Sequence, residues 1–190
     1  DFRLAELDAL LTMAGLEPGP SSSVYSTEDY SPISPYLVAE FPSEEAAVAV
    51  CDRAILIKSM IKIWADGASY KEASSRVRQL PADFVSPHLA EALSWSVTVD
   101  AFGLSLSLEH QEQSRRHFSH LAFKGPVRCR GARGKGPAPD RHFWCIEEHC
   151  PDSKTGLVPA GSAPRRVYFG LELAKSSARG LVHKYDLKKR

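Results

Sequence analysis

The sequence is poor in cysteine and has no long apolar run, and each of these absences excludes a class of protein. Its 190 residues contain 4 cysteines, too few for the disulfide framework of a secreted scaffold of this length. We therefore expect reduced thiols and a cytoplasmic location. No run of about 18 apolar residues occurs, which is the length that a membrane-spanning helix needs. The N-terminal residues also lack the pattern of a signal peptide.

The motifs of nucleotide-dependent enzymes and of zinc sites are missing as well. The glycine-rich run 131–136 lacks both the spacing and the Ser or Thr of a Walker A loop. No G-x-S-x-G turn marks a nucleophile. His and Cys residues gather in 142–150, but a strand there would direct His142 and Cys145 to opposite faces, and the paired spacing of zinc ligands is absent. We therefore predict no catalytic residue, no metal and no cofactor in this chain.

What the sequence does contain is a strong separation of charge along its length. Residues 124–190 hold 15 Lys and Arg against 6 Asp and Glu, which leaves 9 against 17 for residues 1–123. Several aromatic residues lie within the basic part. Cations next to aromatic rings are typical of surfaces that bind phosphates and unstacked bases. The pattern therefore makes RNA the first partner to consider.

Apolar spacing, capping residues and Gly or Pro breaks predict alternating helices and strands. The expected helices are 4–14, 43–53, 69–80, 107–121 and 176–185. The expected strands are 36–41, 54–64, 95–102, 142–148 and 166–174. This order predicts an α+β fold. The first 65 residues or so read as most of a ferredoxin-like half, without the strand that would come before the first helix.

The alternating strands also predict which aromatic and sulfur-containing residues are buried. Phe143, Cys145 and Phe169 are expected in the core. The three histidines of segment 107–121 are expected on a solvated helix face, because that helix is otherwise polar; they are His110, His117 and His120.

Five segments, taken in order and spacing, resemble a known family. They are 95–103, 118–127, 142–148, 167–174 and 184–190. The family is the catalytic subunit of the eukaryotic tRNA guanosine-10 N2-methyltransferases, and the similarity is to its N-terminal half. Segments 1–7 and 54–58 match the same family, so the resemblance covers nearly the whole chain.

The resemblance implies a domain order and a function. Residues 1–66 would form a ferredoxin-like region whose first strand is missing, and 67–185 would form a THUMP domain that binds tRNA by its acceptor end. Residues 186–190 would begin a linker to a methyltransferase domain that uses S-adenosylmethionine. This chain would then be the non-catalytic, tRNA-binding part of the enzyme. The small zinc-containing activator subunit of the family would bind the methyltransferase domain.

Charge and position select the candidate RNA-binding residues. We expect Tyr168 to stack on a base, and the cations to contact phosphates. These cations are Lys124, Arg128, Arg130, Arg141, Arg165, Arg166, Lys175 and Arg179. An alternative function is a protein-interaction module whose acidic front half docks a partner subunit.

Overall fold

A computed structural model describes most of the chain. The described residues are 2–19, 23–28, 30, 34–128, 137–150, 157–159 and 161–177. They form two compact units, one of the described residues within 1–61 and 173–177 and the other of those within 62–172. Both helices and strands are present, which confirms the predicted α+β class. The limits predicted from the sequence, 1–66, 67–185 and 186–190, stay a prediction.

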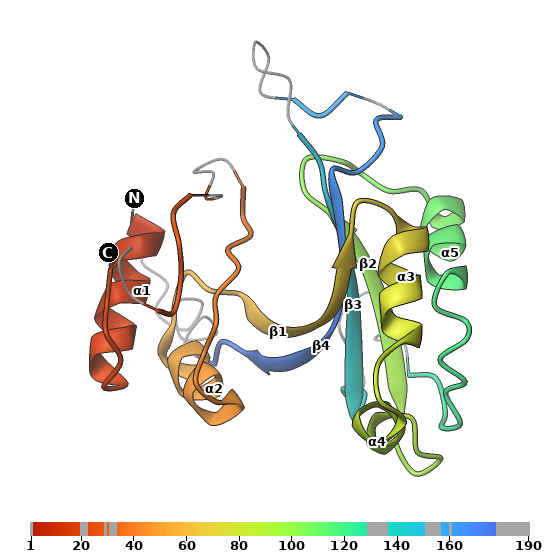
Figure 1. Ribbon diagram of the computed structural model, residues 1–190, viewed down its shortest axis with the longest axis horizontal. Coiled ribbons are helices and arrows are strands. Elements are labelled where there is room, and N and C mark those ends of the chain that lie inside the picture. Colours follow the sequence, from red (N-terminus) through yellow and green to blue (C-terminus); the bar gives the residue numbers. More distant parts are fainter. Residues whose placement is uncertain are drawn as a thin grey trace, which may run out of the picture. The chain divides into compact units, whose positions relative to one another are not determined.

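The regular elements follow the expected order except at residues 36–41 and at the short helices 82–88, which were not predicted (Figure 1). The helices are α1 Phe2–Met13, α2 Glu44–Arg53, α3 Tyr70–Arg78, α4 Ala82–Val85 and α5 Leu108–Arg116, with a short 3-10 helix at Ser86–His88. The strands are β1 Ser59–Gly67, β2 Trp95–Ala101, β3 Arg141–Glu148 and β4 Arg166–Lys175. None of the helices in the described residues is long and apolar enough to cross a membrane.

The first unit packs α1 against α2 around a small apolar core. Leu7, Leu11 and Val50 are buried in it. Gly15, with a φ of 74°, lies just beyond α1, where the sequence placed the end of that helix. The hydroxyl of Ser43 accepts the amide of Ala46 and caps α2, as its sequence position predicted.

Two predicted strands of this unit differ from the structure. Residues 36–41 form no strand: Ala39 makes a single bridge to Tyr25. Prolines flank the segment at 35 and 42 and have no amide hydrogen to extend a ladder. The other strand begins at Ser59 rather than at residue 54.

The late start of β1 has a visible cause in the turn before it. One carboxylate oxygen of Glu6 accepts the amide of Ile55 at 2.7 Å and the other accepts that of Leu56 at 2.9 Å. These amides are therefore hydrogen-bonded to α1 rather than to a neighbouring strand.

Replacing Glu6 with alanine should lower the free energy of unfolding by about 1–2 kcal/mol, since two donors lose their acceptor. Urea unfolding measures the change.

Glu17→Ala is the matched control for this prediction, because the side chain of Glu17 is exposed. Its effect should stay within about 0.5 kcal/mol. Equal stabilities of the Glu6 and Glu17 variants would show that the two hydrogen bonds contribute nothing.

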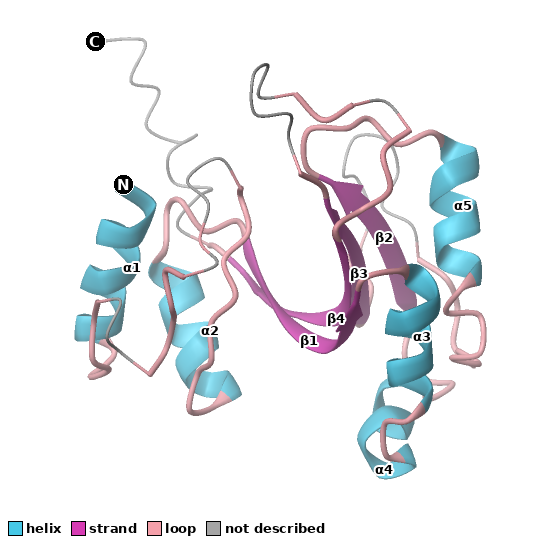
Figure 2. Cartoon of the chain, turned by 45° about the horizontal axis from the view of Figure 1, so that its top comes forward, coloured by secondary structure: helices cyan, strands magenta, loops and turns pink. Residues whose placement is uncertain are grey.

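The second unit is built on a mixed sheet. The strand order is β1-β4-β3-β2, with β2 parallel to β3 and β3 antiparallel to β4. Helices α3 and α5 lie along one face of β2 and β3 (Figure 2). The core lies on that face, where Phe143, Cys145 and Phe169 are fully buried, as predicted.

The helices of this unit begin as predicted, but α5 ends early. The Ser69 hydroxyl accepts the amide of Glu72, whose carboxylate accepts the amide of Ala68 at 2.9 Å; this is the expected capping box of α3. Helix α5 stops at Arg116 because the following amides bond three residues back, for example Phe118 to Arg115, which tightens the chain into turns.

The predicted C-terminal helix over 176–185 lies almost wholly outside the described residues. Ser176 and Ser177 are described and are not helical. Their hydroxyls donate to the carbonyls of Ala54 and Asp52, so the chain is tied to the end of α2 at this point.

Candidate nucleic-acid interface

Seven of the nine predicted RNA-binding residues fall in the described part of the chain, while Arg130 and Arg179 lie outside it. The structure divides the seven by position. One group surrounds the start of β2 and β3 and consists of Lys124, Arg128 and Arg141. Another lies at the far end of β3 and consists of Arg165, Arg166 and Tyr168. Lys175 ends β4 and belongs to the other compact unit.

The first group is organised around Trp95, and we call its three cations, Lys124, Arg128 and Arg141, the basal edge. The amide of Arg128 donates to the Trp95 carbonyl at 2.8 Å, and Arg141 is the register partner of Trp95 in β3. Lys124 lies between Phe123, whose ring stacks on the indole with centroids 4.2 Å apart, and Gly125, whose carbonyl accepts the indole N–H at 2.8 Å. Cations from two segments, 124–128 and the start of β3, therefore lie at the same end of the sheet.

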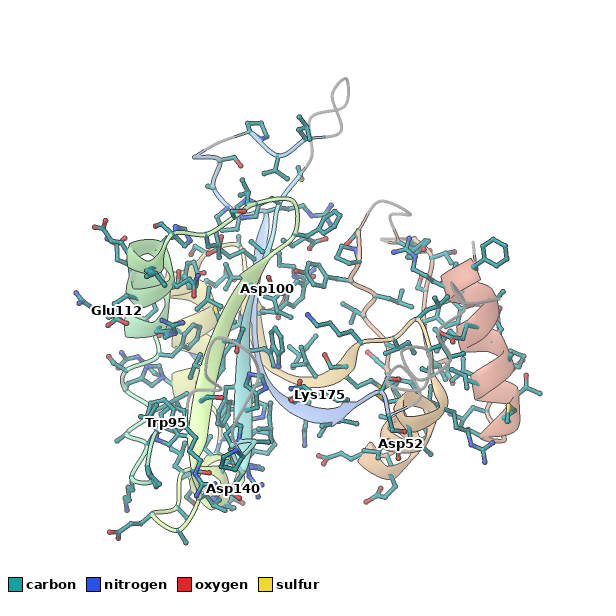
Figure 3. All side chains as sticks on the ribbon, turned by 180° about the vertical axis from the view of Figure 1, so that it is seen from behind. Asp52, Trp95, Asp100, Glu112, Asp140 and Lys175 are labelled. Atoms are coloured by element: carbon teal, nitrogen blue, oxygen red, sulfur yellow. The ribbon has the colours of Figure 1, made fainter. Side chains whose placement is uncertain are left out.

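A clamp between Ser94 and Asp140 fixes this end of β2 and β3. The Ser94 amide donates to the Asp140 carboxylate at 2.8 Å, and the Asp140 amide donates to the Ser94 hydroxyl at 3.1 Å. Figure 3 shows Asp140 beside Trp95 and at the opposite end of the unit from Asp100. Hydrogen bonds from Ser94, aided by the charge of Arg128, lower the pKa of Asp140. This carboxylate is therefore ionised at neutral pH, and its bonds are directed to Ser94.

The cations of the basal edge are largely available for a ligand. Lys124 and Arg128 are exposed and pair with no carboxylate among the described residues. The Nη1 of Arg141 donates to the backbone carbonyl of Asp140, and its Nε is buried and has no partner in the described part of the chain, so a ligand would reach this guanidinium at its outer nitrogens. Guanidinium and ammonium groups in this state bind phosphate oxygens readily.

The second group is mostly engaged in contacts within its own unit. Arg166 donates to the Asp66 carboxylate at 2.6 Å and lies over the Tyr168 ring at 5.6 Å. The Tyr168 hydroxyl donates to Glu148, and burial, with the nearby Glu148 charge, raises the pKa of Tyr168 to about 12. The Arg165 side chain, in contrast, is exposed and forms no ion pair with a described residue.

The two groups do not form one continuous surface. They lie at opposite ends of β3, an eight-residue strand. At about 3.3 Å per residue the separation is roughly 23 Å. The sequence placed all these residues in one basic segment, but the strand carries them apart.

Comparison with known proteins identifies the family. Residues 1–179 match the family described as the Tmrp11 THUMP N-terminal domain. The chain belongs to this family. The resemblance predicted from the five ordered segments is thereby confirmed.

The relatives of this THUMP N-terminal domain are longer proteins. The tRNA (guanine(10)-N(2))-methyltransferases TRMT11 of Gallus gallus and Homo sapiens are each 26% identical to it over 190 residues, which is 100% of this chain and 37% of each relative. The TRMT11 of Dictyostelium discoideum is 23% identical over 199 residues, 38% of its length. The chain therefore spans less than two fifths of these curated relatives.

A solved structure supports the fold. The crystal structure of PH1313 from Pyrococcus horikoshii Ot3 superposes with a TM-score of 0.51 at 14% identity, covering 91% of this chain and 47% of that chain. At this identity the similarity concerns the fold alone.

This THUMP N-terminal domain also contains a buried polar site that was not predicted from the sequence. The Glu147 side chain is fully buried and accepts hydrogen bonds from the hydroxyl of Tyr70, from Nε2 of His110 at 2.5 Å and from Nε2 of His149 at 2.9 Å. His110 lies on the exposed face of α5 as predicted, with 44% of its side chain exposed, but its hydrogen bond to Glu147 was not predicted. His117 is also engaged, since its ring stacks on Tyr70 at 5.0 Å.

The environment of Glu147 favours its ionised form. Burial alone would raise its pKa, but the hydrogen bonds from Tyr70, His110 and His149 outweigh burial and lower it. The burial of Glu147 could have been predicted from its position in the strand. Phe143, Cys145 and Glu147 occupy alternate positions, so all three lie on the same buried face. Among the described residues, no group of three His, Cys, Asp or Glu is placed to hold a metal ion.

Proposed function

We propose that this chain binds tRNA with its basal edge and orients the acceptor end of the tRNA for methyl transfer at guanine-10. The transfer would be carried out in the cytoplasm by a domain outside these 190 residues. That domain would bind S-adenosylmethionine and the small zinc-containing activator subunit. The family and the printed names of the TRMT11 relatives support a tRNA substrate.

The observation that carries the proposal is the convergence of Lys124, Arg128 and Arg141 around Trp95. The carboxylate beside them, Asp140, is hydrogen-bonded to Ser94, and its single charge offsets one of the three cations, so the group keeps a net positive charge. Binding a distant part of a substrate promotes a reaction elsewhere, because it removes the orientational freedom of the reacting end.

The test is the salt dependence of tRNA binding to the Lys124→Ala/Arg128→Ala variant. Each lost phosphate contact should reduce the slope of log K against log salt concentration by about 1, so the double variant should lose about 2. Affinity at low salt should fall roughly tenfold or more. Fluorescence anisotropy with labelled tRNA between about 50 and 300 mM salt gives both values.

Arg116→Ala is the matched control, since that side chain on α5 is 72% exposed and lies outside the basal edge. It should leave the slope nearly unchanged. If the unmodified chain bound no tRNA, or bound it with no dependence on salt, the basal edge would not be an RNA surface. The acidic front half, residues 1–123, would then be tested as a docking site for a protein subunit.

A further inference from the structure

The end of the second unit opposite the basal edge contains a small, highly charged pocket. Its volume is about 270 Å³, and all its lining residues belong to residues 62–172. The lining consists of the chain before α3, two side chains of α3 and the start of β4: Asp66, Gly67, Ala68, Glu72, Arg76, Arg165 and Arg166. Nothing in the proposed tRNA contact at the basal edge uses this pocket.

Three guanidinium groups and two carboxylates line the pocket, which leaves one net positive charge. Arg166 and Arg76 both donate to the Asp66 carboxylate, at 2.6 Å and 3.2 Å. Arg76 also pairs with Glu72 at 2.6 Å. Arg165 pairs with no carboxylate in the described part of the chain, so the uncompensated charge lies on its side chain.

The backbone at the pocket is already satisfied by side chains. The first turn of α3 begins here, and its positive end is capped by Ser69 and Glu72. Gly67 lets this turn approach closely, because a Cβ there would lie 2.8 Å from the Ala73 amide nitrogen. The positive potential of the pocket therefore comes from its three arginines.

We propose that this pocket binds the terminal phosphate of an RNA chain, an inference that rests on the proposed tRNA-binding function. A terminal phosphomonoester carries close to two negative charges and can accept from two guanidinium groups at once. A phosphodiester within the chain carries one. The volume is just below the range of about 300–1,000 Å³ typical of small-molecule sites, which suits a single chain end.

Arg165 and Arg76 are the groups that bind this phosphate. Arg165 is already unpaired. Arg76 and Glu72 are 50% and 43% exposed, and an exposed ion pair of this kind contributes little stability. The phosphate therefore competes with Glu72 for Arg76, and the charge of Glu72 weakens its binding. Arg166 remains paired with Asp66, whose side chain is only 22% exposed. This ion pair holds the two residues in place at the pocket wall.

The experiment compares two RNA duplexes of identical sequence, one with a 5′-phosphate and one with a 5′-hydroxyl. The 190-residue chain should bind the phosphorylated duplex roughly three- to tenfold more tightly. Arg165→Ala should remove this preference. Glu72→Gln should enlarge it, because the glutamine oxygen still accepts the Ala68 amide while the competing charge is gone.

Two controls separate this inference from the proposed function. Lys124→Ala/Arg128→Ala should weaken binding of both duplexes equally and preserve their ratio, and Arg116→Ala should change neither affinity. Equal binding of the two duplexes, or a preference that survives Arg165→Ala, would overturn the terminal-phosphate site and leave tRNA binding intact. Failure of both duplexes to bind at any salt concentration would instead overturn the proposed function.

Discussion

Replacing Glu147 with alanine should lower the free energy of unfolding of the chain by about 3–5 kcal/mol. The buried carboxylate accepts hydrogen bonds from Tyr70 on α3, from His110 on α5 and from His149 just after β3. Alanine would leave these donors without an acceptor inside the protein and would open a cavity. Urea unfolding at neutral pH measures the change.

The matched control is Glu112→Ala on the solvent side of α5. Glu112 is 56% exposed and pairs with Arg116 at 3.5 Å, so its loss should cost less than about 0.5 kcal/mol. A Glu147 variant as stable as the Glu112 variant would show that the buried network contributes nothing to folding.

The same carboxylate should make stability depend on pH in the acid range. Because the folded-state pKa of Glu147 lies below the ordinary value of 4.5, its contribution is fully present above about pH 4.5. It is lost as the pH falls through the folded-state pKa. Glu147→Gln cannot titrate, so its stability deficit relative to the unmodified chain should shrink below about pH 4.5. A deficit that stays constant down to pH 3 would contradict this assignment.

Gly125→Ala should lower the free energy of unfolding by about 3 kcal/mol, at the upper end of the usual cost of overpacking. A Cβ at this position would lie 1.8 Å from the Leu93 carbonyl oxygen, so the backbone must move. Since the Gly125 carbonyl accepts the indole N–H of Trp95, the movement would also displace Lys124 from the basal edge. Urea unfolding and tRNA anisotropy should therefore both change.

Gly161→Ala provides the comparison for this effect. Gly161 has a φ of 76° but no atom within 4 Å of an added Cβ, so alanine there carries backbone strain alone, about 1–2 kcal/mol. Its tRNA affinity should match that of the unmodified chain. If Gly125→Ala were no more costly than Gly161→Ala, the close approach to Leu93 would not constrain the loop.

Local patterns in the sequence were enough for most elements of this fold. The capping residues Ser43 and Ser69 and the helix-terminating Gly15 act over a few residues, so their positions could be read directly. Strict alternation likewise identified β2, β3 and β4 and the buried residues Phe143 and Phe169. The ordered segments also supported the family, which the match over residues 1–179 confirms.

The errors at 36–41 and at the end of α5 have local causes, whereas the start of β1 and the contact of His110 depend on distant residues. The start of β1 is delayed because Glu6, about 50 residues earlier, accepts the amides of Ile55 and Leu56. The hydrogen bond from His110 to Glu147 was missed because the two residues lie on different elements. No local pattern encodes either contact.

By itself, the sequence determined the class of fold, the family and the separation of acidic and basic segments, because each is a property of composition or of near neighbours. Only the tertiary structure decided which cations meet. Strand register joins Arg141 to Trp95 and so to Lys124 and Arg128, while the length of β3 carries Arg165 and Arg166 to the other end of the sheet. Asp66 forms an ion pair with Arg166, whereas Arg165 forms no ion pair with a described residue. Electrostatic interactions depend on the distance between charges in space. For residues that are far apart in the chain, the packing of the sheet sets this distance.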